Sequence, residues 1–84
     1  MAEVVLYTKS YCPYSKECKK WLDEKGVAYY EKSAEDENLK IEMESKTGGR
    51  TDTPQIFVNG HYIGNFDDLK ALDQQGELEE MLKK

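Results

Sequence analysis

Residues 4–31 read VVLYTKSYCPYSKECKKWLDEKGVAYYE, and this stretch decides the fold. Its first five residues, 4–8, are β-branched, aliphatic and aromatic, which is typical of a short buried strand. A helix is predicted over residues 13–25, because it begins at a proline whose missing N–H costs nothing there and stops before a glycine. Residues 27–31 predict a second strand. Strand, helix and strand at this spacing indicate a right-handed βαβ unit with parallel strands.

The rest of the chain predicts a second helix, a hairpin and a C-terminal helical segment. Residues 35–46 carry a few apolar side chains among many charges, which indicates a solvated helix. Two short strands, 55–58 and 61–63, flank an Asn-Gly pair, a strong signal for a two-residue hairpin. From Phe66 onward apolar residues recur at helical spacing, and Gly76 can divide this segment into two helices. We therefore predict an α/β, thioredoxin-like fold: a four-stranded mixed sheet flanked by helices in the order βαβ–α–ββα.

The length and composition limit the classes of function. With 84 residues, we expect residues 1–84 to form one domain. No apolar run approaches the ~20 residues that span a bilayer, so we expect no membrane segment. The N-terminus does not resemble a signal peptide, which makes the cytoplasm the expected compartment. The net charge of -5, with no basic block to offset it, argues against nucleic acid as a partner, and a monomer is the default expectation.

Cys12 stands immediately before the first predicted helix. The positive end of the helix dipole and the unpaired N–H groups there favour an anion, which lowers the pKa of a cysteine. Lys9 and Lys16 would add positive potential. Since the thiolate is the species that attacks a disulfide, this position indicates a redox nucleophile. The alternative is a cysteine that happens to cap a helix, because the short motif Cys-Pro-Tyr-Ser is weak evidence by itself.

Three separated blocks of the sequence resemble the small bacterial glutaredoxins in order and spacing. The blocks are Tyr7-Thr8-Lys9 with Cys12-Pro13-Tyr14-Ser15, then Thr53-Pro54-Gln55-Ile56-Phe57-Val58, and then Ile63-Gly64-Asn65-Phe66-Asp67-Asp68-Leu69. The resemblance extends over nearly the whole chain. It implies a glutathione-dependent thiol–disulfide oxidoreductase with glutathione as co-substrate, glutathionylated proteins as partners and no metal.

The resemblance implies roles for the residues around the first helix. Cys12 would be the nucleophile. Lys9 and Tyr14 would lie beside the glycine carboxylate of glutathione, and Pro13 would belong to the same binding surface. Taken alone, Lys9 would be interpreted as an ordinary surface charge.

The second and third blocks would complete the glutathione site. Pro54 is a cis proline in the family, a geometry that would turn the backbone of Thr53 so that it pairs with the cysteinyl part of glutathione. Asp67 would hold the γ-glutamyl ammonium, while N–H groups near Phe66 and Asp67 would hold the adjacent carboxylate. Without the family, Asp67 is better interpreted as a helix N-cap and Pro54 as a strand-edge residue.

Ser15 departs from the family pattern, because many glutaredoxins have a second cysteine at this position. Serine cannot form the intramolecular disulfide, so the dithiol route for reducing protein disulfides should be lost or impaired. The monothiol route needs one nucleophile. In that route Cys12 takes the glutathione moiety from a mixed disulfide, and a second glutathione regenerates the thiolate.

Two further departures lie near the expected glutathione site. Asp52-Thr53 replaces the usual threonine-valine and adds a negative charge near an anionic ligand. We expect glutathione affinity to be lower by a few tenths to about 1 kcal/mol, with Arg50 as a compensating charge. Asn65 replaces the second glycine of a Gly-Gly pair, and the turn should survive because asparagine tolerates a left-handed backbone.

Cys18 cannot replace the missing partner of Cys12. Six residues along a helix correspond to a rise of ~9 Å, whereas a disulfide needs Cα atoms within ~7 Å. The predicted inward stripe of the first helix consists of Ser15, Cys18, Trp21 and Leu22, so Cys18 is interpreted as a packing cysteine. His61 is the only histidine, and a metal site formed by this chain alone is not expected.

Two other functions compete with deglutathionylation. One is a [2Fe–2S] carrier, in which two subunits each donate one cysteine and one bound glutathione to a shared cluster. The motif here is Cys-Pro-Tyr-Ser, not the Cys-Gly-Phe-Ser of the dedicated carriers, and a proline with a bulky tyrosine would crowd the cluster. The other is a redoxin fed by thioredoxin reductase, which needs two thiols and is disfavoured by Ser15. Monothiol deglutathionylation is the leading hypothesis, with the cluster carrier as the alternative.

Overall fold

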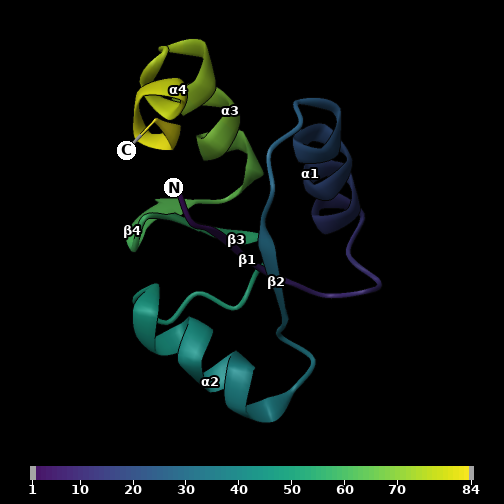
Figure 1. The fold of residues 1–84 in the computed structure, drawn as a ribbon. Helices are drawn as coiled ribbons and strands as arrows, with labels where there is room; N and C mark the ends of the chain where they lie inside the picture. Colours follow the sequence, from purple (N-terminus) through teal and green to yellow (C-terminus); the bar gives the residue numbers. More distant parts are fainter. Residues whose placement is uncertain (1, 84) are drawn as a thin grey trace.

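The computed structural model describes residues 2–83 and places four strands in one sheet with helices on both faces (Figure 1). The strands are β1 (Val4–Thr8), β2 (Tyr30–Ser33), β3 (Gln55–Val58) and β4 (His61–Gly64), and their order in the sheet is β2-β1-β3-β4. β1 and β2 are parallel, whereas the other neighbouring pairs are antiparallel.

The helices are α1 (Pro13–Glu24), α2 (Glu37–Lys46), α3 (Phe66–Gln74) and α4 (Glu77–Leu82). The predicted mixed sheet, its thioredoxin-like layout and the order βαβ–α–ββα are confirmed. No helix within residues 2–83 has the length and apolarity to cross a membrane.

Alternating side chains along the strands give each face of the sheet its own core. On one face, buried strand residues pack against α1, α3 and α4; the strand residues are Val4, Leu6, Ile56 and Val58, and the helical ones are Cys18, Leu22, Phe66, Leu69 and Leu78. On the other face, Tyr7 and Phe57 pack with Met43 of α2 and with Ala34. Figure 1 shows α2 alone on that side of the sheet, opposite the other three helices. Full burial of a large apolar side chain stabilises the fold by about 1.5–3 kcal/mol. The buried side chains of α1 and α3 therefore hold these helices against their face of the sheet.

The start of α1 follows the sequence signals closely. The helix begins at Pro13 with Cys12 as its N-cap residue, and Gly26 (φ +71) follows its last turn. Its buried side chains lie on one stripe, as predicted; they are Ser15, Cys18 and Leu22. Trp21 is partly buried beside this stripe and meets the ring of Phe66 edge-on, with 5.8 Å between ring centroids. This packing fixes how the N-terminus of α1 faces the sheet.

The second strand begins three residues later than predicted. The prediction was 27–31, whereas β2 spans Tyr30–Ser33. Its parallel register with β1 pairs Tyr30 with Val5, so the boundary is set by the neighbouring strand. Val27 instead closes the turn after α1, because its N–H donates to the Leu22 carbonyl at 2.9 Å.

The hairpin and the division of the C-terminal segment are confirmed. Asn59 (φ 52) and Gly60 (φ 82) both have the left-handed backbone that a two-residue type I′ turn requires. The Asn59 side chain also donates to the Met81 carbonyl at 2.9 Å, which ties the hairpin to α4. Gly76 (φ 78) separates α3 from α4.

Asn65, and not Asp67, is the N-cap of α3. The Asn65 side chain accepts from the Asp68 N–H at 3.0 Å, and the Asp68 carboxylate accepts from the Asn65 N–H at 3.0 Å, forming a capping box. The N-cap interpretation of Asp67 is therefore wrong; this side chain is 82% exposed in the first turn. The left-handed backbone expected at Asn65 belongs to Gly64 (φ +123), while Asn65 is extended.

Candidate active site

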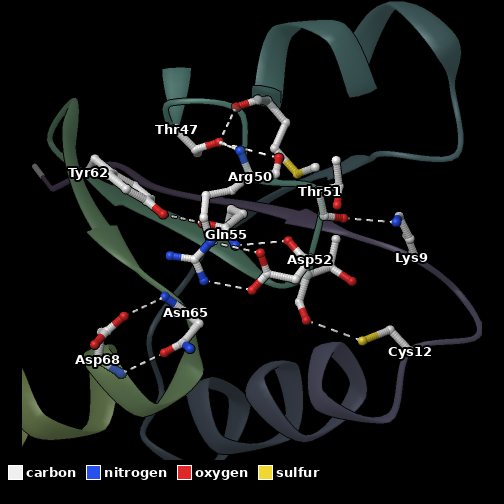
Figure 2. Close-up of polar contacts among 12 residues, drawn as sticks. Lys9, Cys12, Thr47, Arg50, Thr51, Asp52, Gln55, Tyr62, Asn65 and Asp68 are labelled. Atoms are coloured by element: carbon white, nitrogen blue, oxygen red, sulfur yellow. Dashed lines mark hydrogen bonds and ion pairs between the residues drawn. The ribbon is translucent and has the colours of Figure 1, made fainter. Parts of the chain in front are cut away.

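Cys12 lies at the N-terminus of α1, facing the segment that leads into β3 (Figure 2). Its thiol donates to the backbone carbonyl of Thr53, with 3.3 Å between sulfur and oxygen. The peptide bond between Thr53 and Pro54 is cis, as the resemblance implied. The fold therefore brings the first two sequence blocks into direct contact at the sulfur.

The surroundings of Cys12 favour its thiolate. Burial opposes ionisation, but the hydroxyl groups of Thr53 and Ser15 and the backbone N–H groups of Ser15 and Tyr14 outweigh it and lower the pKa of Cys12. The two N–H groups belong to the first turn of α1, where such donors have no partner within the helix. The predicted influence of the helix end is thus present. Hydrogen bonds, and not the charges of Lys9 and Lys16, account for the lowered pKa.

A pocket of about 260 Å³ lies beside this contact and collects residues from all three sequence blocks. Five of the predicted binding residues line it: Tyr14, Thr53, Pro54, Phe66 and Asp67. Asp52 and Asn65 line it as well, although the sequence analysis marked them as departures and not as binding residues. Asp52 directly precedes Thr53, and Asn65 directly precedes Phe66. This adjacency to predicted binding residues is the sequence signal that could have indicated them.

Lys9 and Pro13 lie outside the set of residues that line this pocket. Lys9 Nζ donates to the Thr51 carbonyl at 3.0 Å, which joins the loop after β1 to the loop before β3 (Figure 2). Pro13 is the exposed first residue of α1. The loop itself is held by Glu35, whose carboxylate accepts from the Ser10 N–H at 2.6 Å. Lys9 is thus bonded to the residue before Asp52, and Pro13 directly follows the nucleophile.

Arg50 compensates the charge of Asp52 through a bidentate ion pair. The Arg50 Nε and Nη2 atoms lie 2.8 and 2.7 Å from the two Asp52 carboxylate oxygens. The Arg50 hydrogen bond lowers the pKa of Asp52, so this carboxylate is ionised at neutral pH. The fully buried Gln55 donates to the Asp52 carbonyl at 2.8 Å and accepts from the Tyr62 hydroxyl, which anchors the pocket wall to β3 and β4 (Figure 2).

The second cysteine has no access to the reaction. Cys18 is fully buried in the core beneath α1, and burial raises the pKa of its thiol to about 12. It is therefore a neutral packing group, as predicted. Ser15, in the position of the missing thiol, is also fully buried.

A larger cavity of about 600 Å³ lies on the α2 face of the sheet. It is lined mainly by aromatic side chains and lysines, including Tyr7, Tyr30, Phe57, Tyr62, Lys32 and Lys46. The thiol chemistry is placed at the smaller pocket, because that pocket is lined by Thr53, whose carbonyl accepts from the Cys12 thiol. Within residues 2–83, no group of three or more His, Cys, Asp and Glu side chains is arranged to hold a metal ion.

Comparison with known proteins agrees with this geometry. Residues 4–63 match the family model described as Glutaredoxin. The chain is 45% identical over 83 residues to Glutaredoxin 3 of Escherichia coli (strain K12), a match that covers 99% of this chain and 100% of that protein.

Solved structures lead to the same family. The solution structure of glutaredoxin from Brucella melitensis is 38% identical, with a TM-score of 0.83 over 99% of this chain and 90% of that one. The crystal structure of the buckwheat glutaredoxin–glutathione complex is 26% identical, with a TM-score of 0.84 over 95% of this chain and 76% of that one. The chain belongs to the glutaredoxin family, whose members are thiol–disulfide oxidoreductases that use glutathione as a substrate.

Proposed function

We propose that this glutaredoxin reduces glutathione mixed disulfides by a monothiol mechanism in which Cys12 is the reacting sulfur. The observation that carries the proposal is the state of the two cysteines: Cys12 is partly exposed beside the pocket with a lowered pKa, whereas Cys18 is buried with a raised one. Ser15 stands where a second thiol would be needed for the dithiol route. The expected substrates are glutathionylated proteins in the cytoplasm, and the expected acting species is a monomer.

In the first step, the Cys12 thiolate attacks the glutathione sulfur of the mixed disulfide. A new sulfur–sulfur bond joins Cys12 to glutathione, and the substrate leaves as a thiolate. In the second step, the thiolate of another glutathione attacks the bound glutathione sulfur. Glutathione disulfide leaves, and the Cys12 thiolate is regenerated. The one free glutathione therefore supplies the two electrons that reduce the mixed disulfide.

The pocket offers matching groups for the ends of glutathione. The side chain of Asp67 is exposed at the pocket and can pair with the γ-glutamyl ammonium. The N–H groups of Phe66 and Asp67 take no part in the capping box of α3, which leaves them free for the neighbouring carboxylate. Lys9 is bonded to the Thr51 carbonyl, next to the pocket residue Asp52, and its ammonium can attract the glycine carboxylate from there.

Turnover tests the proposal. Purified protein is supplied with a glutathionylated peptide and glutathione, and glutathione disulfide formation is followed through glutathione reductase. Cys12→Ser should abolish turnover. Cys18→Ala, the matched control, should retain it once allowance is made for any loss of folded protein. Full activity in Cys12→Ser, or loss of activity in folded Cys18→Ala, would overturn the proposed mechanism.

A further inference from the structure

A row of apolar side chains crosses all four strands on the α2 face of the sheet. In the strand register Tyr30 pairs with Val5, Val5 with Phe57, and Phe57 with Tyr62. Directly opposed residues present their side chains to the same face, so these four residues form one apolar row. All four line the cavity of about 600 Å³ on that face. Tyr30 and Tyr62 are 66% and 39% exposed, so α2 leaves both ends of the apolar row open to solvent.

The aromatic rings of this cavity are held in place by their neighbours. Tyr7 meets Phe57 edge-on with 5.7 Å between ring centroids, and the Phe57 and Tyr62 centroids are 5.1 Å apart. The Tyr7 hydroxyl donates to the Glu42 carboxylate, and the Tyr62 hydroxyl donates to the side chain of Gln55. Because each tyrosine is held by its ring and by its hydroxyl, a ligand would meet rings that are already ordered, which lowers the entropic cost of binding.

Two lysines give the cavity a positive charge that is only partly compensated. The Lys32 ammonium is paired with the Glu42 carboxylate at 3.0 Å. The Lys46 ammonium lies 6.0 Å from the centroid of the Phe57 ring, and no carboxylate of residues 2–83 forms an ion pair with it. Among residues 2–83, Glu3 is the one acidic residue that lines the cavity. The ammonium of Lys46 is therefore available to an anionic group that lies beside the rings.

We propose that this cavity binds a small planar aromatic anion, with its ring on the apolar row and its anionic group at Lys46. The volume lies within the ~300–1,000 Å³ of small-molecule sites, which combine apolar and aromatic walls with a few polar groups. Aromatic rings pack on one another in offset or edge-on geometry, so a flat ligand suits these walls. Within residues 2–83, the cavity shares no lining residue with the pocket beside Cys12, and the inference is independent of the proposed function.

Titrations of the ¹⁵N-labelled protein, followed by NMR, test the proposal. The probes are 2-naphthoate, an aromatic carboxylate, and AMP, a nucleotide. We expect at least one of them to bind with a Kd of about 1 mM or tighter, with the largest amide shifts at Val5, Tyr30 and Phe57. Binding of 2-naphthoate alone would identify the ligand class as aromatic carboxylates, and binding of AMP alone would identify it as nucleotides.

Control ligands separate the two features of the probe. Cyclohexanecarboxylate and ribose 5-phosphate carry the anionic group without the aromatic ring, and they should bind at least about fivefold more weakly than the matching probe. Adenosine carries the ring without the anionic group, and it should bind roughly two- to fivefold more weakly than AMP.

Matched variants test the assigned positions of the ring and the anionic group. Lys46→Gln should weaken binding of the probe roughly two- to fivefold, whereas Lys40→Gln, which is exposed on α2 outside the lining, should not. Tyr30→Thr keeps a residue that favours strands but removes the exposed ring, so it should weaken binding of the probe and of adenosine. Tyr11→Thr, which removes a similarly exposed ring outside the lining, should leave both affinities unchanged. The spectrum of each variant verifies that it is folded.

Three results would overturn the inference: no saturable shifts with either aromatic anion, equal binding of the ligands without a ring, or shifts confined to Tyr14 and Asp67 in the smaller pocket. Equal affinities for Lys46→Gln and Lys40→Gln would contradict the assigned position of the anionic group. Because the titrations contain no glutathione, these results are separate from those of the turnover assay.

Discussion

Replacing Asp52 with asparagine is expected to strengthen glutathione binding. Asp52 and Asp67 are both in the wall of the pocket, and glutathione carries net negative charge at neutral pH. The substitution removes the repelling carboxylate of Asp52 and leaves Asp67 to pair with the γ-glutamyl ammonium. It also releases the Arg50 guanidinium, now held at 2.8 and 2.7 Å by Asp52, to attract the ligand. Both changes act in the same direction.

The size of the effect follows from the exposure of the pair. The side chains of Arg50 and Asp52 are 42% and 53% exposed, so water and salt screen their charges. Exposed ion pairs contribute about 0.2–1 kcal/mol, which corresponds to binding about 1.5–5 times tighter. The gain should shrink with added salt, since the Debye length falls from about 10 Å at 0.1 M to about 3 Å at 1 M.

The assay is isothermal titration of glutathione at low and at high ionic strength. Arg50→Gln is the matched reverse variant, because it leaves the Asp52 carboxylate uncompensated and should weaken binding by a similar factor. If Asp52→Asn binds glutathione equally or more weakly at low salt, then the Asp52 carboxylate does not repel the ligand. A gain that persists unchanged at high salt would show that its cause is not electrostatic.

Three other perturbations have defined outcomes. The rate at which Cys12 takes the glutathione moiety from a glutathionylated peptide, measured without free glutathione, should fall as the pH drops through the lowered pKa of Cys12 and be full above it, because the thiolate is the reacting form; a pH–rate midpoint at the ordinary cysteine value of 9.0 would contradict this. Asn65→Ala removes the capping box of α3 and should lower the free energy of unfolding by about 1 kcal/mol, measured by urea denaturation. Gly64→Ala should cost more, because the new Cβ would overlap the Asp68 carboxylate at a backbone angle of φ +123; a urea midpoint equal to that of Asn65→Ala would contradict this.

Local signals were enough to predict most of the fold. The proline at the start of α1 and the Asn-Gly turn each fix the backbone through their own covalent structure, so the structure confirms both. The start of β2 could not be predicted in the same way. It depends on the register with β1, in which Tyr30 is the first residue of β2 and pairs with Val5. Residues 27–29 are apolar but lie outside the strand. A strand boundary set by a neighbour carries no local signal.

The cap of α3 shows the same limit at the scale of one turn. Asn65, Asp67 and Asp68 are all capping residue types within four positions. The choice among them is made by Gly64, whose left-handed backbone brings the chain into the helix two residues earlier than an N-cap at Asp67 would require. Backbone direction at a glycine is decided by the tertiary structure, and the residue type alone leaves it open.

The residues of the candidate site could be predicted from the sequence, but the electrostatics around Cys12 could not. The three blocks predicted which residues gather around Cys12, and five of them line one pocket. The source of the lowered pKa was attributed in part to lysines, whereas hydrogen bonds from Thr53, Ser15 and Tyr14 account for it in the structure. Such bonds depend on side-chain rotamers and on distances of a few ångströms, and no sequence pattern encodes these.

The most direct test of the central claim is mass spectrometry of the protein after reaction with a glutathionylated peptide in the absence of free glutathione. We expect a stable mass gain of one glutathione located on Cys12, with release of the reduced peptide, and loss of that gain as soon as glutathione is added. A glutathione adduct on Cys18, an internal disulfide between the two cysteines, or peptide release by Cys12→Ser would contradict it.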